Sequence, residues 1–188
     1  MPSSVVYDLQ SEQIIALRIY LAMDEILRQL EAGATMTEHG TELLNDPIAE
    51  RLLTSTLPAH LAYTWRDGTP RVVPIWFHWT GSQIVMASPS RAPKLRVLRD
   101  GDPVSVTIDS VEWPYHVLSV RGPTTITTAA GAVVPEYAAA ATRYFGEQQG
   151  AAWVAQLPPE MRMVRVAVTP QWVSILDFET RFPSALSA

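Results

Sequence analysis

A cluster of basic residues between positions 91 and 99 is the clearest candidate for chemistry in this sequence. The chain contains fourteen lysines and arginines, and four of them lie here: Arg91, Lys94, Arg96 and Arg99. Lys94 is the only lysine of the chain. Because the chain as a whole is acidic, with a formal net charge of -5 and a pI near 5.3, this local positive charge predicts a binding site for an anion.

The basic cluster falls where a strand is expected to end and a short helix to begin. We predict that helix from about Pro93 to Gly101, and the first turn of a helix offers unpaired N–H groups and a partial positive charge. Ser88, Ser90 and Arg91 add hydrogen-bond donors beside Lys94 at the same end. A phosphate group suits this donor set. The same residue types also fit an exposed helix with no ligand, so the residues alone leave both interpretations open.

Composition argues against several other kinds of site and partner. The chain has no cysteine, which excludes disulfides, thiolate metal sites and cysteine nucleophiles. Its four histidines, His39, His60, His78 and His116, show no spacing typical of metal ligands, and we expect no metal site. The acidic charge disfavours a nucleic-acid partner. No signal peptide is recognisable, and the most apolar window, Ile14–Met23, is too short and too charged to span a bilayer, so we expect a cytoplasmic protein without a membrane partner.

The spacing of apolar residues predicts a mainly β fold with flanking helices. A helix over Ser11–Ala32, with a wide apolar stripe, and a linker over Gly33–Thr41 come first; Asp46 then caps a short helix. We divide the chain into a helical extension with its linker (1–44), a barrel domain (45–180) and a tail (181–188). Extended patterns predict strands over His60–Trp65, Arg71–Trp79, Gln83–Ser88, Val104–Asp109, His116–Thr127, Met161–Val168 and Gln171–Phe178, with later helices over Val134–Phe145 and Ala151–Leu157. Short strands without alternating helices favour a closed or partly closed barrel.

Three consecutive runs carry a resemblance to a known family. The runs are Asp67–Trp79, Ser88–Arg99 and Asp102–Val106, in that order. Together they resemble the pyridoxamine 5'-phosphate oxidase-like split β-barrel family, and within it the flavin- and deazaflavin-dependent oxidoreductases. The resemblance implies a split β-barrel of the FMN-binding type, here with an added N-terminal helix.

The resemblance also implies a role for individual residues. The second strand of the family lies along the ring and ribityl chain of the cofactor, and the end of the third strand with the following turn contacts the ribityl chain and phosphate. Lys94 matches the phosphate lysine, although Ala92 and Pro93 separate it from Arg91, where the family pattern has an adjacent Arg–Lys pair. The cofactor contacts implied are Arg71, Val72, Val73, Pro74, Ile75, Trp76, Ala87, Ser88, Ser90, Arg91 and Lys94.

Pro74 has a physical consequence of its own. Proline cannot donate a hydrogen bond to a neighbouring strand, so this position is expected at a sheet edge or a bulge. Such a position leaves backbone groups available to a ligand.

We therefore expect a homodimeric oxidoreductase that moves a hydride between a flavin-type cofactor and a small organic substrate. The resemblance implies FMN or coenzyme F-420, bound between the subunits; Arg96 and Arg99 favour F-420 because its tail is acidic, whereas FMN needs only the phosphate site. Trp113, His116 and Trp172 are candidates for a substrate pocket, and no catalytic side chain is assigned. Two alternatives stay open: a non-catalytic carrier of FMN, deazaflavin or haem, and an interaction domain with an empty barrel.

Overall fold

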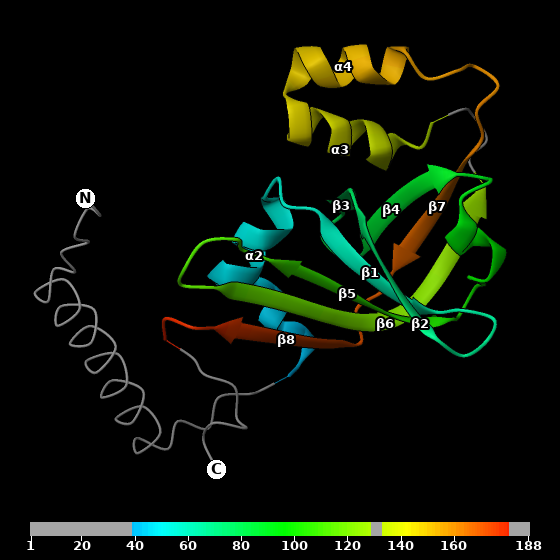
Figure 1. The fold of residues 1–188 in the computed structure, drawn as a ribbon. Coiled ribbons are helices and arrows are strands. Elements are labelled where there is room, and N and C mark those ends of the chain that lie inside the picture. The colour runs from blue at the N-terminus through cyan, green and yellow to red at the C-terminus, as the bar shows by residue number, and fades with distance from the viewer. Residues whose placement is uncertain (1–38, 129–132, 181–188) are drawn as a thin grey trace, which may run out of the picture. The chain divides into compact units, whose positions relative to one another are not determined.

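The fold comes from a computed structural model that describes residues 39–128 and 133–180. The predicted helix Ser11–Ala32 lies outside these residues. The described part is mainly β, with short helices at its flanks, which confirms the predicted fold class (Figure 1). No helix in these two ranges has the length and apolar character needed to cross a membrane.

Eight strands form the sheet, and every strand pair is antiparallel. The strands are β1 (Ala59–Thr64), β2 (Pro70–Ile75), β3 (Phe77–Trp79), β4 (Ile84–Pro89), β5 (Pro103–Asp109), β6 (His116–Thr128), β7 (Met163–Val168) and β8 (Trp172–Asp177). The helices are the 3-10 turns η1 (Thr41–Asn45) and η2 (Pro93–Arg96) and the α-helices α2 (Pro47–Thr54), α3 (Pro135–Phe145) and α4 (Glu147–Ala155).

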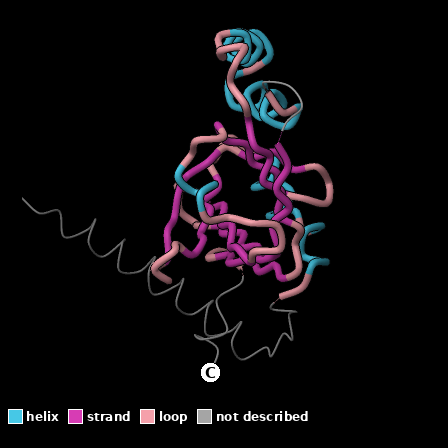
Figure 2. The backbone as a smooth tube through the Cα atoms, turned by 90° about the vertical axis from the view of Figure 1, so that its right-hand side faces the viewer, coloured by secondary structure: helices cyan, strands magenta, loops and turns pink. Residues whose placement is uncertain are grey.

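Two sheets share the long strand β6 and together make a barrel. Sheet A has the order β2-β1-β5-β6-β8, and sheet B has the order β6-β7-β4-β3. The outermost strands of this path, β2 and β3, follow each other in the chain with only Trp76 between them. No hydrogen bonds join β2 to β3, so the backbone itself closes the ring of strands there. An end-on view shows the strands arranged in a ring (Figure 2).

Gly122 allows β6 to pass from one sheet to the other. It pairs with Val104 in sheet A, and two residues later Thr124 pairs with Val168 in sheet B. A Cβ atom on Gly122 would lie 1.8 Å from the carbonyl oxygen of Thr169, far inside van der Waals contact. Only glycine permits this close approach of two backbones.

The core fills the barrel and extends under α2. Strand residues that alternate inward, such as Leu61, Phe77 and Leu118, are fully buried. α2 adds Leu52 and Leu53 to the same cluster. Asp46 fixes the start of this helix, as expected from its position before Pro47, because its carboxylate accepts a hydrogen bond from the Ile48 N–H at 2.8 Å.

Four details differ from the sequence-based expectations. The strand expected over Arg71–Trp79 breaks at Trp76 into β2 and β3, because the chain changes pairing partner there. The helix expected over Pro93–Gly101 is only the 3-10 turn η2, and α4 begins at Glu147 instead of Ala151. The turn η1 was not expected; the N–H of Gly40 beside it donates to the Val173 carbonyl of β8 at 3.0 Å.

Gly122→Ala is expected to destabilise the barrel. The added methyl group must displace the Thr169 backbone, and overpacking of this kind costs about 1–3 kcal/mol or more. Urea unfolding of the two proteins measures the difference. Ser119→Ala on the same strand, where a Cβ atom is already present, is the control and should be nearly neutral; equal stabilities of Gly122→Ala and the control would contradict the argument.

Candidate functional site

The break at Trp76 creates a fork between two strands. β3 pairs with β4 only as far as Met86, while β2 turns away to pair with β1. Ala87–Pro89 of β4 and the whole outer edge of β2 therefore have no neighbouring strand on the sides that border the fork. Unpaired edges present backbone N–H and C=O groups that a ligand or partner can use. The edge position predicted for Pro74 is confirmed.

Ser88 brings a polar side chain to the inner side of the fork. It lies on the same face of β4 as Ile84 and Met86, which belong to the core, and is only 4% exposed. Its hydroxyl makes no hydrogen bond to any residue in the described ranges. Among the described residues the only fully buried polar side-chain atom without a hydrogen-bond partner is Arg143 Nε, so the Ser88 hydroxyl itself keeps some access to solvent or to a ligand.

Lys94 lies in η2, directly beyond the end of β4. Its side chain is half-buried, and within the described part of the chain no acidic residue pairs with it. Burial lowers the pKa of Lys94 from its ordinary value of 10.5. A partly desolvated ammonium group without a counterion is a natural receptor for an anionic ligand.

Hydrogen bonds to the surrounding chain hold the basic turn in place. The Arg66 guanidinium, in the β1–β2 hairpin, donates to the Arg96 carbonyl at 3.1 Å. The Thr124 hydroxyl of β6 donates to the Arg99 carbonyl at 2.7 Å. The Arg99 side chain donates to carbonyls of its own turn, whereas the exposed guanidinium groups of Arg91 and Arg96 have no partner among residues 39–128 and 133–180. Two cations therefore remain available beside Lys94.

The predicted contacts on β2 divide between the two faces of the strand. Val73 and Ile75 pack against the core, and Arg71 shares their face. Arg71 is exposed and is held near the hairpin by Thr69, whose hydroxyl accepts its hydrogen bond at 2.7 Å. Val72 and Pro74 point to the outer face of sheet A, where Val72 is 61% exposed. No side chain of β2 is fully buried, which is unusual for a barrel strand.

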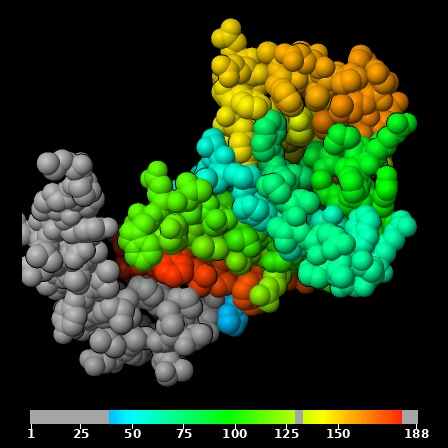
Figure 3. Space-filling model, viewed as in Figure 1, coloured from blue at the N-terminus to red at the C-terminus, as the bar shows by residue number. Residues whose placement is uncertain are grey.

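Trp76 packs beneath the helix pair α3–α4. Its ring stacks on Tyr144 with centroids 5.0 Å apart and also contacts Tyr137, Phe145 and Trp153. The two helices lie on one side of the barrel, where α3 contacts β3 and β4 (Figure 3). Trp76, a predicted cofactor contact, therefore belongs to an aromatic cluster that the sequence analysis did not predict.

Arg143 and Tyr144 anchor α3 to the barrel through main-chain carbonyls. The Arg143 guanidinium donates to the carbonyls of Leu53 and Phe77 and lies over the Phe77 ring at 4.3 Å. The Tyr144 hydroxyl donates to the Leu57 carbonyl at 2.7 Å. Burial lowers the pKa of Arg143 and raises that of Tyr144. Arg143 joins the end of α2 and the start of β3 to α3, and Tyr144 joins the α2–β1 loop to the same helix.

The three candidates for a substrate pocket do not converge. Trp113 packs edge-on against Tyr115, and His116 is 3.2 Å from the Asp177 carboxylate at the end of β8. Trp172 begins β8, under the Arg121 guanidinium at 4.0 Å. Along an extended strand the two ends of β8 are about 17 Å apart, so Trp172 and His116 cannot line one small pocket within a single chain.

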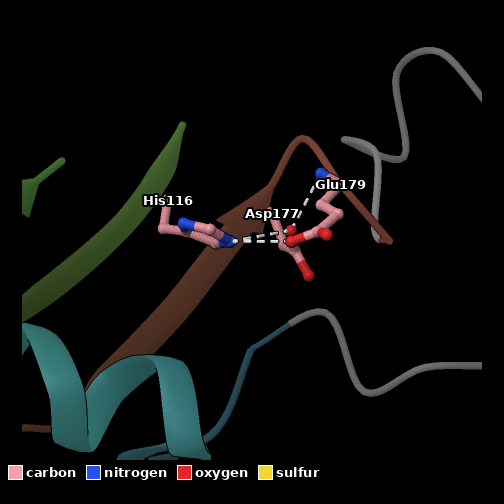
Figure 4. A group of neighbouring side chains, drawn as sticks. All are labelled: His116, Asp177 and Glu179. Carbon is pink, nitrogen blue, oxygen red and sulfur yellow. Dashed lines mark hydrogen bonds and ion pairs between the residues drawn. The ribbon is translucent and has the colours of Figure 1, made fainter. Parts of the chain in front are cut away.

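His116 belongs to a cluster with two acidic residues, Asp177 and Glu179 (Figure 4). Burial alone would raise the pKa of Asp177, but hydrogen bonds from Thr180 and Glu179, with His116 nearby, outweigh it and leave that pKa lowered. Sequence spacing missed this cluster because its members meet only through the pairing of β6 with β8.

An open groove of about 730 Å³ crosses the outer face of sheet A. It is lined by β1, β5 and β6, with Ala62, Ser105 and Arg121 among its residues. None of the predicted cofactor contacts lines it. The groove and the fork are therefore separate features.

The comparisons with known proteins support the fold. No family model matches the sequence, and no curated protein matches it. An F420 reductase of known structure is 25% identical, covers 68% of this chain and 94% of its own, and superimposes with a TM-score of 0.51. A conserved hypothetical protein from Mycobacterium tuberculosis gives a TM-score of 0.61 at 16% identity, over 77% of this chain and 90% of its own.

A third solved structure is also similar to this chain. The FAD and heme binding protein from Mycobacterium smegmatis has a TM-score of 0.54 at 21% identity, over 78% of this chain and 75% of its own. The fold is a split β-barrel. In this split barrel, the fork is the opening between the outer edge of β2 and the end of β4. It arises because β2 and β3 pair with different strands.

The unpaired Lys94 gives a prediction for the stability of the ligand-free split barrel. Because the folded state lowers its pKa, the ammonium reduces stability at neutral pH, and this loss is recovered as the pH rises towards 10.5. Lys94→Met should therefore raise the free energy of unfolding at pH 7, by an amount that shrinks between pH 7 and 10. Urea unfolding at several pH values tests this, with Arg51→Met, an exposed cation on α2, as control. A less stable Lys94→Met protein at pH 7 would refute it.

Proposed function

We propose that this split barrel is an oxidoreductase that binds FMN or coenzyme F-420 at the fork between β2 and β4. The cofactor ring supplies hydride transfer to or from a small organic substrate. The residues of this chain bind the phosphate, orient the ring and exclude water. No side chain is required as a proton donor in this proposal.

One observation carries the proposal: Lys94, in the turn η2 that follows β4, is half-buried and has no counterion among the described residues. A phosphate dianion docked there would give the ammonium a partner and would offer acceptors to the Ser88 and Ser90 hydroxyls. The edge of β2 would supply backbone groups for the polar side of the ring, while Val73 and Ile75 supply apolar contact.

The named solved structures point to the same class of ligand. One is an F420 reductase and another an FAD and heme binding protein. For F-420, whose tail is acidic, Arg91 and Arg96 are suitable partners because both guanidinium groups are exposed and unpaired among the described residues. The sequence also predicted Arg99 as a partner of the acidic tail, but its guanidinium donates to the carbonyls of Leu98 and Arg96 in its own turn. FMN would use Lys94 and the serines without these arginines.

We further propose that two copies of the chain pair through the outer face of sheet A. A row of cross-strand neighbours runs through Val72, Ala62, Ser105, Arg121 and Trp172. The middle of this row is small and carries no charge, so a second sheet can approach closely. A homodimer would also cover Val72 and the open edge of β2, and would complete the cofactor site from both subunits.

A non-catalytic carrier is the alternative, and one observation favours it. The rings of Tyr144, Phe145 and Trp153 already pack around Trp76, so side chains occupy part of the space beside the fork. Such a carrier would bind FMN, the deazaflavin or haem without turnover. Steady-state assays with reduced cofactor and an electron acceptor separate the two functions, since only the enzyme oxidises the cofactor catalytically.

Lys94→Ala should weaken cofactor binding. Loss of a charge-assisted hydrogen bond to phosphate costs about 1.5–3 kcal/mol, which is roughly 10- to 150-fold in Kd. Fluorescence titrations of wild type and variant with FMN and with F-420 measure it and identify the preferred cofactor. Arg51→Ala, a cation on α2, should bind as wild type does. An unchanged Kd for Lys94→Ala with both cofactors would count against the site.

Val72→Arg should convert the dimer into a monomer. The change places a charge at an exposed apolar position that the proposed interface buries. Light scattering after size-exclusion chromatography measures the mass. Val111→Arg, at an exposed position in the β5–β6 loop, is the matched control and should remain dimeric. A wild-type monomer, or a dimeric Val72→Arg protein, would contradict this interface.

A further inference from the structure

His116, Asp177 and Glu179 converge where β6 begins and β8 ends. His116 and Asp177 are direct partners in the strand register, so the two backbones hold them side by side. The His116 Nε2 atom is 3.2 Å from Asp177 Oδ1 and 3.9 Å from Glu179 Oε2 (Figure 4). One ligand atom from each residue lies within 4.8 Å of the other two. The three side chains therefore surround one point.

Asp177 is fixed before any ligand arrives. Its side chain is 3% exposed, and its Oδ1 accepts hydrogen bonds from the N–H groups of Glu179 at 2.9 Å and Thr180 at 3.3 Å. The Thr180 hydroxyl donates to Oδ2. Carboxylates that bind metals are commonly held by such outer hydrogen bonds. Glu179 is different: its side chain is 64% exposed and free to adjust.

The charge balance of the cluster favours a cation. Two carboxylates face one imidazole, and in the described ranges no lysine or arginine forms an ion pair with either of them. A half-buried carboxylate of α3 has a permanent cation beside it, since Glu136 has Arg165 of β7 at 2.8 Å. The buried Asp177 carboxylate lacks this compensation, and a bound metal ion would supply it.

The spacing fits a small divalent ion. Zn²⁺ binds imidazole nitrogen and carboxylate oxygen at about 2.0–2.2 Å, so two ligand atoms at a tetrahedral angle are about 3.4 Å apart. The observed separations of 3.2 and 3.9 Å bracket this value. Rotation of the exposed Glu179 side chain is sufficient to close the site, and the strands need not move.

We propose that His116, Asp177 and Glu179 bind a first-row divalent transition metal, with Zn²⁺ the best match. One imidazole with two carboxylates suits this class, whereas Ca²⁺ and Mg²⁺ prefer oxygen ligands alone. Water completes the coordination. The ion joins the end of β8 to the start of β6, and the site is separate from the fork, so it does not depend on the proposed cofactor.

The proposal is tested by titrating Zn²⁺ into the chelator-treated, full-length, cofactor-free protein in a calorimeter. One ion per chain should bind to wild type. His116→Gln and Glu179→Gln should each weaken this binding, by at least the roughly 10- to 100-fold that the loss of an outer-shell partner costs. Co²⁺ in place of Zn²⁺ should give visible absorption bands that are lost in His116→Gln. Circular dichroism checks that both variants are folded; Glu179 is exposed, so its replacement leaves the core intact.

The chain offers a matched control in a second histidine–aspartate pair. His60 Nδ1 lies 3.3 Å from Asp109 Oδ1 on the outer face of sheet A, but no third ligand joins this pair in the described residues. His60→Gln should therefore bind Zn²⁺ as wild type does. The proposal is overturned if His116→Gln retains wild-type affinity, if His60→Gln loses it, or if wild type binds no stoichiometric Zn²⁺. None of these results bears on Lys94 and the cofactor.

Discussion

The change of strand partner at Trp76 is the constraint on which the rest of the split barrel depends. β2 pairs with β1, β3 pairs with β4, and one residue joins them. The chain thus closes the barrel covalently while leaving two strand edges without partners. Hydrogen-bonding groups at such edges must find another partner, because unsatisfied backbone groups are costly when buried. The fork is therefore a direct consequence of how the barrel closes.

Side chains from distant parts of the sequence brace this point. Tyr144 stacks on Trp76, and Arg143 donates to the carbonyl of Phe77, the next residue along the chain. On the opposite side of the barrel, Gly122 lets β6 continue from sheet A into sheet B, because glycine has no Cβ atom to clash with Thr169. Aromatic packing stabilises the break at Trp76, whereas the passage of β6 between the sheets depends on glycine having no side chain. Both sheets end at the Trp76 break and share β6 at Gly122.

Three kinds of surface result from this architecture. The fork has unpaired strand edges and lies beside cations that have no partner among the described residues, the outer face of sheet A has the small uncharged residues Ala62 and Ser105 at its middle, and the junction of β6 with β8 has a histidine beside two carboxylates. The fork and the β6–β8 junction sit where a strand ends or loses its neighbour, which is where a β-barrel can place polar groups without disturbing its core. Val72 belongs both to the predicted cofactor contacts and to the proposed interface, whereas the histidine cluster shares no residue with either.

Local sequence determined much of this protein. Alternating apolar residues fixed nearly all strands, Asp46 with Pro47 fixed the start of α2, and Pro74 marked an edge, because each of these signals acts through its own backbone. The cluster of Ser88, Arg91 and Lys94 is visible in the sequence because these residues are close in the chain, and their meeting at one phosphate stays a prediction. The break at Trp76, the anchoring by Arg143 and the meeting of His116 with Asp177 were decided only by the tertiary structure. Each depends on which distant strand or helix becomes a neighbour, and strand pairing between remote segments leaves no local pattern in the sequence.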